Sequence, residues 1–94
     1  MPQNHFNKLT PAEAERLAML AEEAAEVIVE INKILRHGYE SFHPNEPGIS
    51  NRSRLTREVA DFHAVSVMME DDLTSDAQPP SVIIEKKKRY AHHQ

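Results

Sequence analysis

Apolar residues recur at spacings of three and four between residues 11 and 37, with no Gly or Pro after Pro11. This period predicts an amphipathic helix over residues 11–37. Thr10, Pro11 and Glu13 mark its start, because Thr and Glu at this spacing form a capping box and Pro suits the first helical position. Gly38 is placed to cap its end. The apolar stripe, which we expect to face the core, comprises Leu17, Leu20, Ala24, Val27, Ile28, Ile31, Ile34 and Leu35.

Two further helices are expected downstream. Residues 39–50 contain Pro and Gly without sustained periodicity, which is typical of a loop. A second helix is predicted over residues 51–71, and a third over residues 81–92 with Ser81 as its cap. The third helix carries the basic run Lys86 to Arg89. The apolar stripe of the second helix comprises Leu55, Val59, Phe62, Val65 and Met69.

The chain length of 94 residues suits a single domain spanning residues 1–94. The predicted fold class is all-α, a helical bundle of about three main helices. A protomer of this size buries a modest fraction of its surface, so we expect it to form oligomers. A short turn is expected around His5 and Phe6, before the first helix.

Composition excludes several classes of site and partner. The chain has no Cys, which excludes disulfides, thiolate zinc sites and cysteine nucleophiles. The formal net charge of -4 argues against binding to nucleic acid or an acidic membrane. No apolar run approaches the ~18 residues of a membrane span, and the first nine residues lack the apolar segment of a signal peptide. We therefore expect a cytoplasmic protein without membrane contact.

Acidic residues gather on one flank of the first predicted helix. At 100° per residue, Glu23, Glu26 and Glu30 fall within about 60° of one another, whereas Glu22 lies further toward solvent. These acids can point toward a common ligand beside the core. They can equally form a solvated face, since exposed charges are the norm.

The second helix carries acids closer to its apolar stripe. Glu58 falls about 40° from the centre of the stripe and Asp61 sits at its edge. A carboxylate on a buried face is costly unless it is paired or metal-bound, so Glu58 requires a cation. Pairing with Arg54 or Arg57 is one solution. A divalent ion held by oxygen ligands from both helices is the other.

These acids resemble the motif of the MazG-like all-α nucleoside triphosphate pyrophosphohydrolases, which reads E-E-x-x-E, a spacer, and E-x-x-D. The motif stands here as EEAAE at residues 22–26 and EVAD at residues 58–61. The segment ILRHGYE, residues 34–40, resembles a small phage-type branch, and a basic last helix is also typical. The resemblance covers about residues 9–90. The spacer is longer than in many members, and Ala60 stands where Gly is common.

The resemblance implies a function for each motif residue. Glu23, Glu26, Glu58 and Asp61 match the family's Mg²⁺ ligands, with Mn²⁺ as an alternative ion. Glu22 and Glu23 are the implied catalytic residues that activate the attacking water. The implied reaction cleaves a nucleoside triphosphate to a monophosphate and pyrophosphate. The implied fold is a helical bundle completed by dimerisation, and the implied assembly is a homodimer or tetramer with active sites near the subunit interface.

Substrate contacts are predicted from charge and aromaticity, although each residue can also be ordinary surface or packing. The candidate phosphate partners are Lys33, Arg36, Arg54, Arg57, Lys86 and Arg89. The candidates for contacts with the base or ribose are Asn32, Tyr39, Phe42 and Asn51.

Three other interpretations compete with the enzyme. The first is a non-catalytic helical dimer that serves as an interaction or regulatory module on the same scaffold. The second is a nucleic-acid-binding protein that uses Arg52, Arg54, Arg57 and the basic run, against which the net charge and the acidic first helix argue. The third is a coiled coil, but the first helix is broken at Gly38 after too few heptads.

Overall fold

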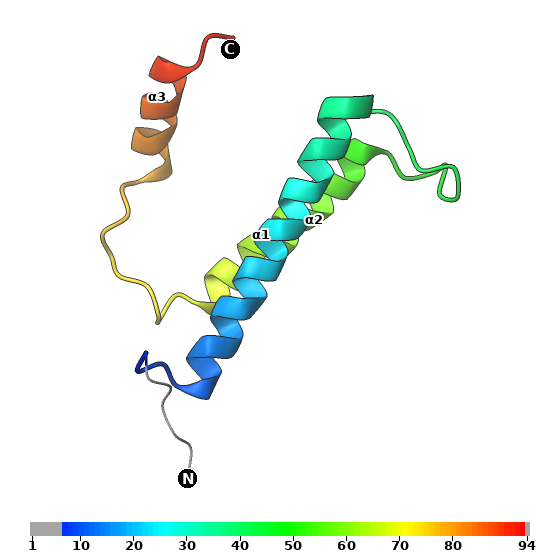
Figure 1. Cartoon of the computed structure of the whole chain (residues 1–94). Helices are drawn as coiled ribbons and strands as arrows, with labels where there is room; N and C mark the ends of the chain where they lie inside the picture. Colours follow the sequence, from blue (N-terminus) through cyan, green and yellow to red (C-terminus); the bar gives the residue numbers. More distant parts are fainter. Residues whose placement is uncertain (1–6, 94) are drawn as a thin grey trace.

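The computed structural model describes residues 7–93, which form three α-helices: α1 (Pro11–His37), α2 (Asn51–Met68) and α3 (Pro80–Tyr90) (Figure 1). Among these residues there is no β-strand, and an isolated antiparallel bridge joins Phe42 to Ser50. The predicted all-α class is confirmed. No helix in the described part of the chain is long and apolar enough to cross a membrane.

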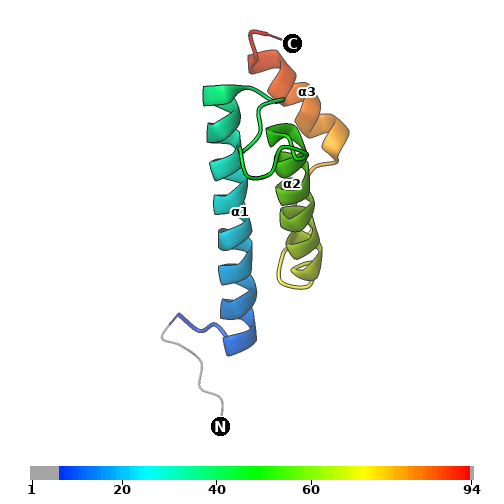
Figure 2. The ribbon, with the colours of Figure 1, turned by 90° about the vertical axis from the view of Figure 1, so that its right-hand side faces the viewer.

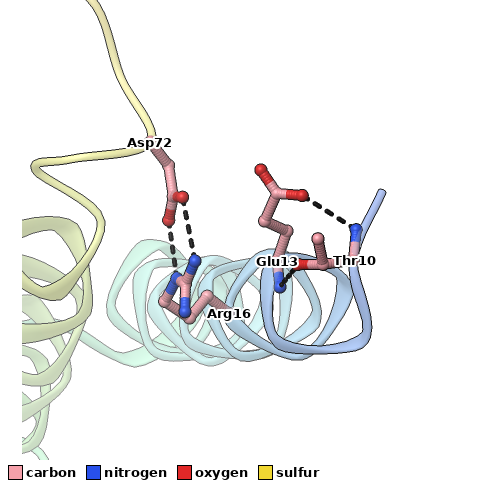
Figure 3. Close-up of polar contacts among 4 residues, drawn as sticks. All are labelled: Thr10, Glu13, Arg16 and Asp72. Atoms are coloured by element: carbon pink, nitrogen blue, oxygen red, sulfur yellow. Dashed lines mark hydrogen bonds and ion pairs between the residues drawn. The ribbon is translucent and has the colours of Figure 1, made fainter. Parts of the chain in front are cut away.

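The ends of α1 follow from its local sequence. The Glu13 N–H donates to Thr10 Oγ1 (3.1 Å) and the Thr10 N–H donates to the Glu13 carboxylate (2.8 Å), which completes the predicted capping box (Figure 3). At the other end Gly38 adopts a φ of 89°, which favours glycine, and caps the last turn. The turn predicted around His5 and Phe6 lies outside the described residues.

The starts of α2 and α3 differ in chemistry. Ser50 caps α2, because its side chain accepts a hydrogen bond from the backbone N–H three residues later (3.1 Å). By contrast, α3 begins at Pro80 and has no side-chain cap. The prediction that Ser81 caps the third helix is therefore wrong. Pro79 and Pro80 set this start, since a proline at the first helical position lacks the N–H that a cap would satisfy.

The last two helices also differ from their predicted bounds. α2 ends at Met68 instead of residue 71, and the chain continues in turns in which the Asp72 N–H donates to the Met69 carbonyl (2.8 Å). α3 ends at Tyr90 instead of residue 92.

Among the described helices, only α1 and α2 pack against each other. They run antiparallel and lie side by side in both views (Figures 1 and 2). α3 overlaps α2 in Figure 2 but lies well apart from it in Figure 1, and all its residues are exposed. Within one protomer the predicted three-helix bundle is therefore a two-helix pair with a detached third helix.

The protomer has a very small core. Val65 and Met69, which are 6% and 1% exposed, are the fully buried apolar residues of the described chain. The radius of gyration is 17.4 Å, whereas a compact domain of this length would have about 12 Å. Most of the apolar surface that could form a core is therefore open in a single copy.

The apolar stripe predicted for α1 does not face α2 as a whole, which corrects the expectation. Leu20, Val27 and Ile34 are half-buried and turn toward α2. The remaining large apolar residues of the stripe are exposed. Consecutive residues of a helix point about 100° apart, so α2 cannot cover these residues as well as the half-buried ones. These exposed members are Leu17, Ile28, Ile31 and Leu35.

An ion pair ties the first turns of α1 to the segment that follows α2. Arg16 Nε and Nη2 donate to the two carboxylate oxygens of Asp72 at 2.6 and 2.9 Å (Figure 3). This two-pronged geometry is the strongest form of an arginine–carboxylate contact. The hydrogen bond from Arg16 lowers the pKa of Asp72.

Candidate metal centre

Three carboxylates converge between the two packed helices. Glu23 comes from α1, and Glu58 and Asp61 come from α2. Each offers one oxygen, and these oxygens lie within 4.8 Å of one another. Glu23 and Glu58 are half-buried, whereas Asp61 is exposed. Three of the four predicted metal ligands are thus brought together from distant positions in the sequence.

The cluster arises because each helix places an acid among its inward-facing positions. Burial recurs at spacings of three and four along both helices, so each has one stripe turned toward the other. The inward positions of α1 are Leu20, Glu23, Val27, Glu30 and Ile34. Those of α2 are Leu55, Glu58, Phe62 and Val65, and Met69 continues the stripe directly after the helix.

The surroundings of Glu58 disfavour its charged form. Partial burial is the largest cause and raises the pKa of Glu58, because the charged carboxylate loses hydration. Neighbouring negative charges raise it further, in the order Asp61, Glu26, Glu23 and Glu30. No positive charge offsets these effects on Glu58.

The pKa of Glu23 is raised in the same way, and its causes show that the other two motif acids lie nearby. Partial burial comes first in raising the pKa of Glu23, followed by the charges of Asp61, Glu22 and Glu26. Glu22 and Glu26 are themselves exposed. Glu26, the fourth predicted ligand, therefore lies close enough to act on the cluster electrostatically but is not one of its three members.

The alternative in which Glu58 pairs with an arginine is not seen. Arg54 Nη2 instead contacts Glu46 at 3.0 Å, and the charge of Arg57 also acts on Glu46, whose pKa is lowered. Within residues 7–93, none of the three clustered carboxylates makes an ion pair. A negative cluster without a protein counter-charge suits a hard divalent cation, which prefers carboxylate oxygens.

Glu30 is a fourth inward acid, one that sequence reasoning placed on the acidic flank without giving it a role. It is 5% exposed, and its Oε1 accepts from Lys33 Nζ at 3.2 Å. Its Oε2 is buried and has no hydrogen-bond partner in the described chain. Buried polar atoms are nearly always paired, so this oxygen marks a place for a further donor or cation. The sequence does contain a feature that could have predicted the inward position of Glu30. Glu30 lies seven residues after Glu23, which places both acids on the same stripe of the helix.

The predicted phosphate partners fall into three groups. Lys33 and Arg36 line a cavity of about 480 Å³ at the end of α1. Arg57 is exposed on α2 and is not among the residues that line this cavity. Lys86 and Arg89 belong to α3, so one protomer does not bring them to the acids.

The candidates for base and ribose contacts are also divided. Phe42 and Asn51 line the same cavity, whereas Asn32 does not. The ring of Tyr39 lies under the guanidinium of Arg52, 4.2 Å from the ring centroid. Arg54, the remaining predicted phosphate partner, also lines the cavity.

No protein-family model, curated protein or solved structure matches this chain. The comparisons therefore assign it to no family. The MazG-like resemblance rests on the motif residues themselves and stays a prediction.

Proposed function

We propose that this protein is a Mg²⁺-dependent pyrophosphohydrolase that cleaves a nucleoside triphosphate to a monophosphate and pyrophosphate. The observation that carries the proposal is the half-buried cluster of Glu23, Glu58 and Asp61, which has no cation among the described side chains. Like charges in a partly buried site oppose folding, so a bound divalent ion explains why these positions are acidic. The choice of reaction rests on the resemblance of the two acidic motifs.

The donor set fits Mg²⁺, with Mn²⁺ as the alternative. Mg²⁺ is usually held by one or a few carboxylates and keeps water or phosphate oxygens in its other positions. Glu23, Glu58 and Asp61 supply such carboxylates from two helices, and the exposed Glu26 is a candidate fourth ligand. When bound, the ion would neutralise phosphate charge and lower the pKa of a coordinated water.

Glu22 and Glu23 are the candidates for orienting the attacking water and accepting its proton. Lys33, Arg36 and Arg57 are candidate phosphate partners in the same protomer. Lys86 and Arg89 of α3 would have to come from a second copy of the chain.

We also infer that the chain acts as a homodimer or tetramer with a MazG-like helical bundle. Residues 17, 21, 24, 28, 31 and 35 of α1 are all apolar and follow the alternating spacing of four and three that coiled-coil seams use. The large members of this set are exposed in one protomer. A second copy packed along this stripe would bury it and supply the core that one protomer lacks.

The reaction is tested by measuring pyrophosphate release from a panel of canonical and modified nucleoside triphosphates with Mg²⁺ or Mn²⁺. We expect Glu58→Gln to lower the rate by more than about 100-fold, because loss of a ligand should cost at least as much as loss of a residue supporting one. Glu15→Gln, on the exposed face of α1, should leave the rate unchanged. Full activity in Glu58→Gln would refute the ligand assignment. Absence of both pyrophosphate release and an Mg²⁺- or Mn²⁺-dependent rise in melting temperature would favour the non-catalytic helical dimer.

A further inference from the structure

The cavity at one end of the helix pair is built by three segments. The last turn of α1, the first turn of α2 and the loop between them enclose about 480 Å³, a size typical of small-molecule sites. We call it the loop pocket. The lining residues used in the argument are Lys33, Arg36, Phe42, Glu46, Asn51 and Arg54.

Hydrogen bonds hold the base of the loop in place. The buried Asn51 donates from its side chain to the Gly38 carbonyl (3.3 Å) and from its backbone to the Ser41 carbonyl (2.7 Å). The bridge between Phe42 and Ser50 closes the loop just beyond this point. Figure 1 shows the loop projecting to one side of the helix pair, next to the end of α1 and the start of α2. The pocket is therefore a preformed feature of the protomer.

The loop pocket is positively charged in an acidic protein. Its lining carries three positive side chains, Lys33, Arg36 and Arg54, and one negative side chain, Glu46. With the histidines neutral, the formal charge of the lining is +2, whereas that of the whole chain is -4. Arg54 is engaged with Glu46, and Lys33 with Glu30. Arg36 makes no ion pair or hydrogen bond among residues 7–93, so its guanidinium is available to an anion. Guanidinium groups match phosphate oxygens in two-pronged geometry.

An aromatic ring stands beside these cations. Phe42 is 51% exposed and forms part of the wall of the pocket. An exposed phenyl ring is available for stacking with a planar ligand, and nucleic-acid bases stack on such rings whatever their sequence. A phosphate partner and a stacking surface in one cavity indicate a ligand with a planar ring joined to a phosphate.

The pocket lies one helical turn from Glu58, the nearest member of the acid cluster along α2. Arg54 precedes Glu58 by four residues, about 6 Å along α2. On α1, Lys33 pairs with Glu30, whose charge acts on Glu58. A ligand seated in the pocket would therefore reach the clustered carboxylates with groups attached to its phosphate.

We propose that the loop pocket binds the nucleoside monophosphate portion of a nucleotide, with the base on Phe42 and the first phosphate on Arg36 and Arg54. The outer phosphates then point toward Glu23, Glu58 and Asp61. The orientation of the outer phosphates rests on the proposed function. Occupancy of the pocket by the monophosphate portion requires no metal.

The test is titration of the full chain with nucleoside monophosphates in EDTA, followed by calorimetry or NMR. We expect saturable binding of at least one monophosphate, weakened about 5- to 150-fold in Phe42→Ala and at least about 10-fold in Arg36→Ala. Both side chains are exposed, and circular dichroism will show whether each variant keeps its fold. Tyr90→Leu and Lys87→Ala, which alter an exposed aromatic and an exposed cation on α3, should bind as the wild type does.

Three binding results would overturn the proposal. They are no monophosphate binding in EDTA, binding that is unchanged in both pocket variants, and inorganic phosphate binding as tightly as the monophosphates. Monophosphate binding with the expected variant pattern but without pyrophosphate release would support the pocket and refute the hydrolase. Pyrophosphate release that is unaffected by Arg36→Ala and Phe42→Ala would support the hydrolase and refute the pocket.

Discussion

Glu58 occupies an inward position of α2 that an apolar side chain would fill at lower cost. Its neighbours along the same stripe are Leu55 and Phe62, and the acids around it raise its pKa instead of lowering it. A carboxylate in this position weakens the metal-free protein. The same arrangement favours a cation that neutralises several carboxylates at once, so stability and metal binding should depend on Glu58 in opposite directions.

We expect Glu58→Gln to stabilise the metal-free protein near neutral pH. The pKa of Glu58 is higher in the folded state than in the unfolded state, where it is near 4.5. Well below pH 4.5 the carboxyl group is protonated in both states and does not affect the free energy of unfolding. As the pH rises through the folded pKa, its ionisation lowers the free energy of unfolding. The melting temperature of Glu58→Gln in EDTA should therefore exceed that of the wild type above about pH 5 and match it well below pH 4.5. Thermal unfolding followed by circular dichroism across this range measures the difference.

Glu15→Gln is the matched control, because Glu15 is exposed on α1 away from the cluster. Its melting temperature should follow that of the wild type at every pH. A Glu58→Gln variant that is less stable than the wild type at neutral pH without metal would contradict the charge-repulsion account.

Sequence reasoning predicted Glu23, Glu26, Glu58 and Asp61 as ligands, from helical spacing and from the motif resemblance, and the structure brings together all of them except Glu26. Sequence reasoning gave no role to Glu30 or to the loop pocket. Which flank of α1 turns toward α2 is decided by packing, and the pocket depends on a loop whose shape is fixed by hydrogen bonds of Asn51. Neither property can be read from helical periodicity alone.

Among the helices, α1 and α3 show how strongly local chemistry controls an element's start. The capping box of Thr10 and Glu13 satisfies two backbone donors at the start of α1. Ser81 has the residue type of a cap but lies inside α3, after Pro80. Thr10 and Ser81 therefore allow a side chain that caps a helix to be compared with one of a similar type that does not.

Thr10→Ala should lower the free energy of unfolding by about 0.5–2 kcal/mol, the usual loss for a side-chain cap. Ser81→Ala should change it by less than about 0.5 kcal/mol, since Ser81 is exposed and makes no capping bond. Urea unfolding of both variants beside the wild type gives the two values. Equal losses in both would contradict the assigned helix starts.

The predicted ends of a helix are correct where capping residues, proline or glycine mark them, and wrong where the end depends on tertiary packing. The bounds of α1 follow from its cap, its proline and Gly38. The end of α2 was misplaced because turn residues after Met68 continue its acidic and apolar pattern. The apolar positions of α1 were treated as one stripe, although they form two, and only packing separates them.

At the scale of the whole molecule, a single copy of this shape buries very little apolar surface. Its core is limited to a few side chains between α1 and α2, and α3 makes no contact with either helix. Large apolar side chains stay exposed along α1 and on α3. A second copy is the simplest source of the missing burial.

Ile28→Lys should convert the assembly into monomers, because it places a charge in the exposed heptad stripe of α1. Val29→Lys is the matched control, since Val29 is a similarly exposed apolar residue on α1 but lies outside that stripe. Sedimentation velocity should show a dimer or tetramer for the wild type and for Val29→Lys. A wild-type chain that is monomeric and unfolds cooperatively at micromolar concentration would rule out this assembly.

The central claim is that Glu23, Glu58 and Asp61 bind a divalent cation, and calorimetric titration with Mn²⁺ at neutral pH tests it most directly. We predict saturable binding to the wild type and to Glu15→Gln, and its loss in Glu58→Gln and in Asp61→Asn. The same binding should stabilise the wild type by about 2.7 kcal/mol when free metal is 100-fold above Kd. A wild-type protein without saturable binding, or a Glu58→Gln variant that binds Mn²⁺ as tightly as the wild type, would contradict the claim.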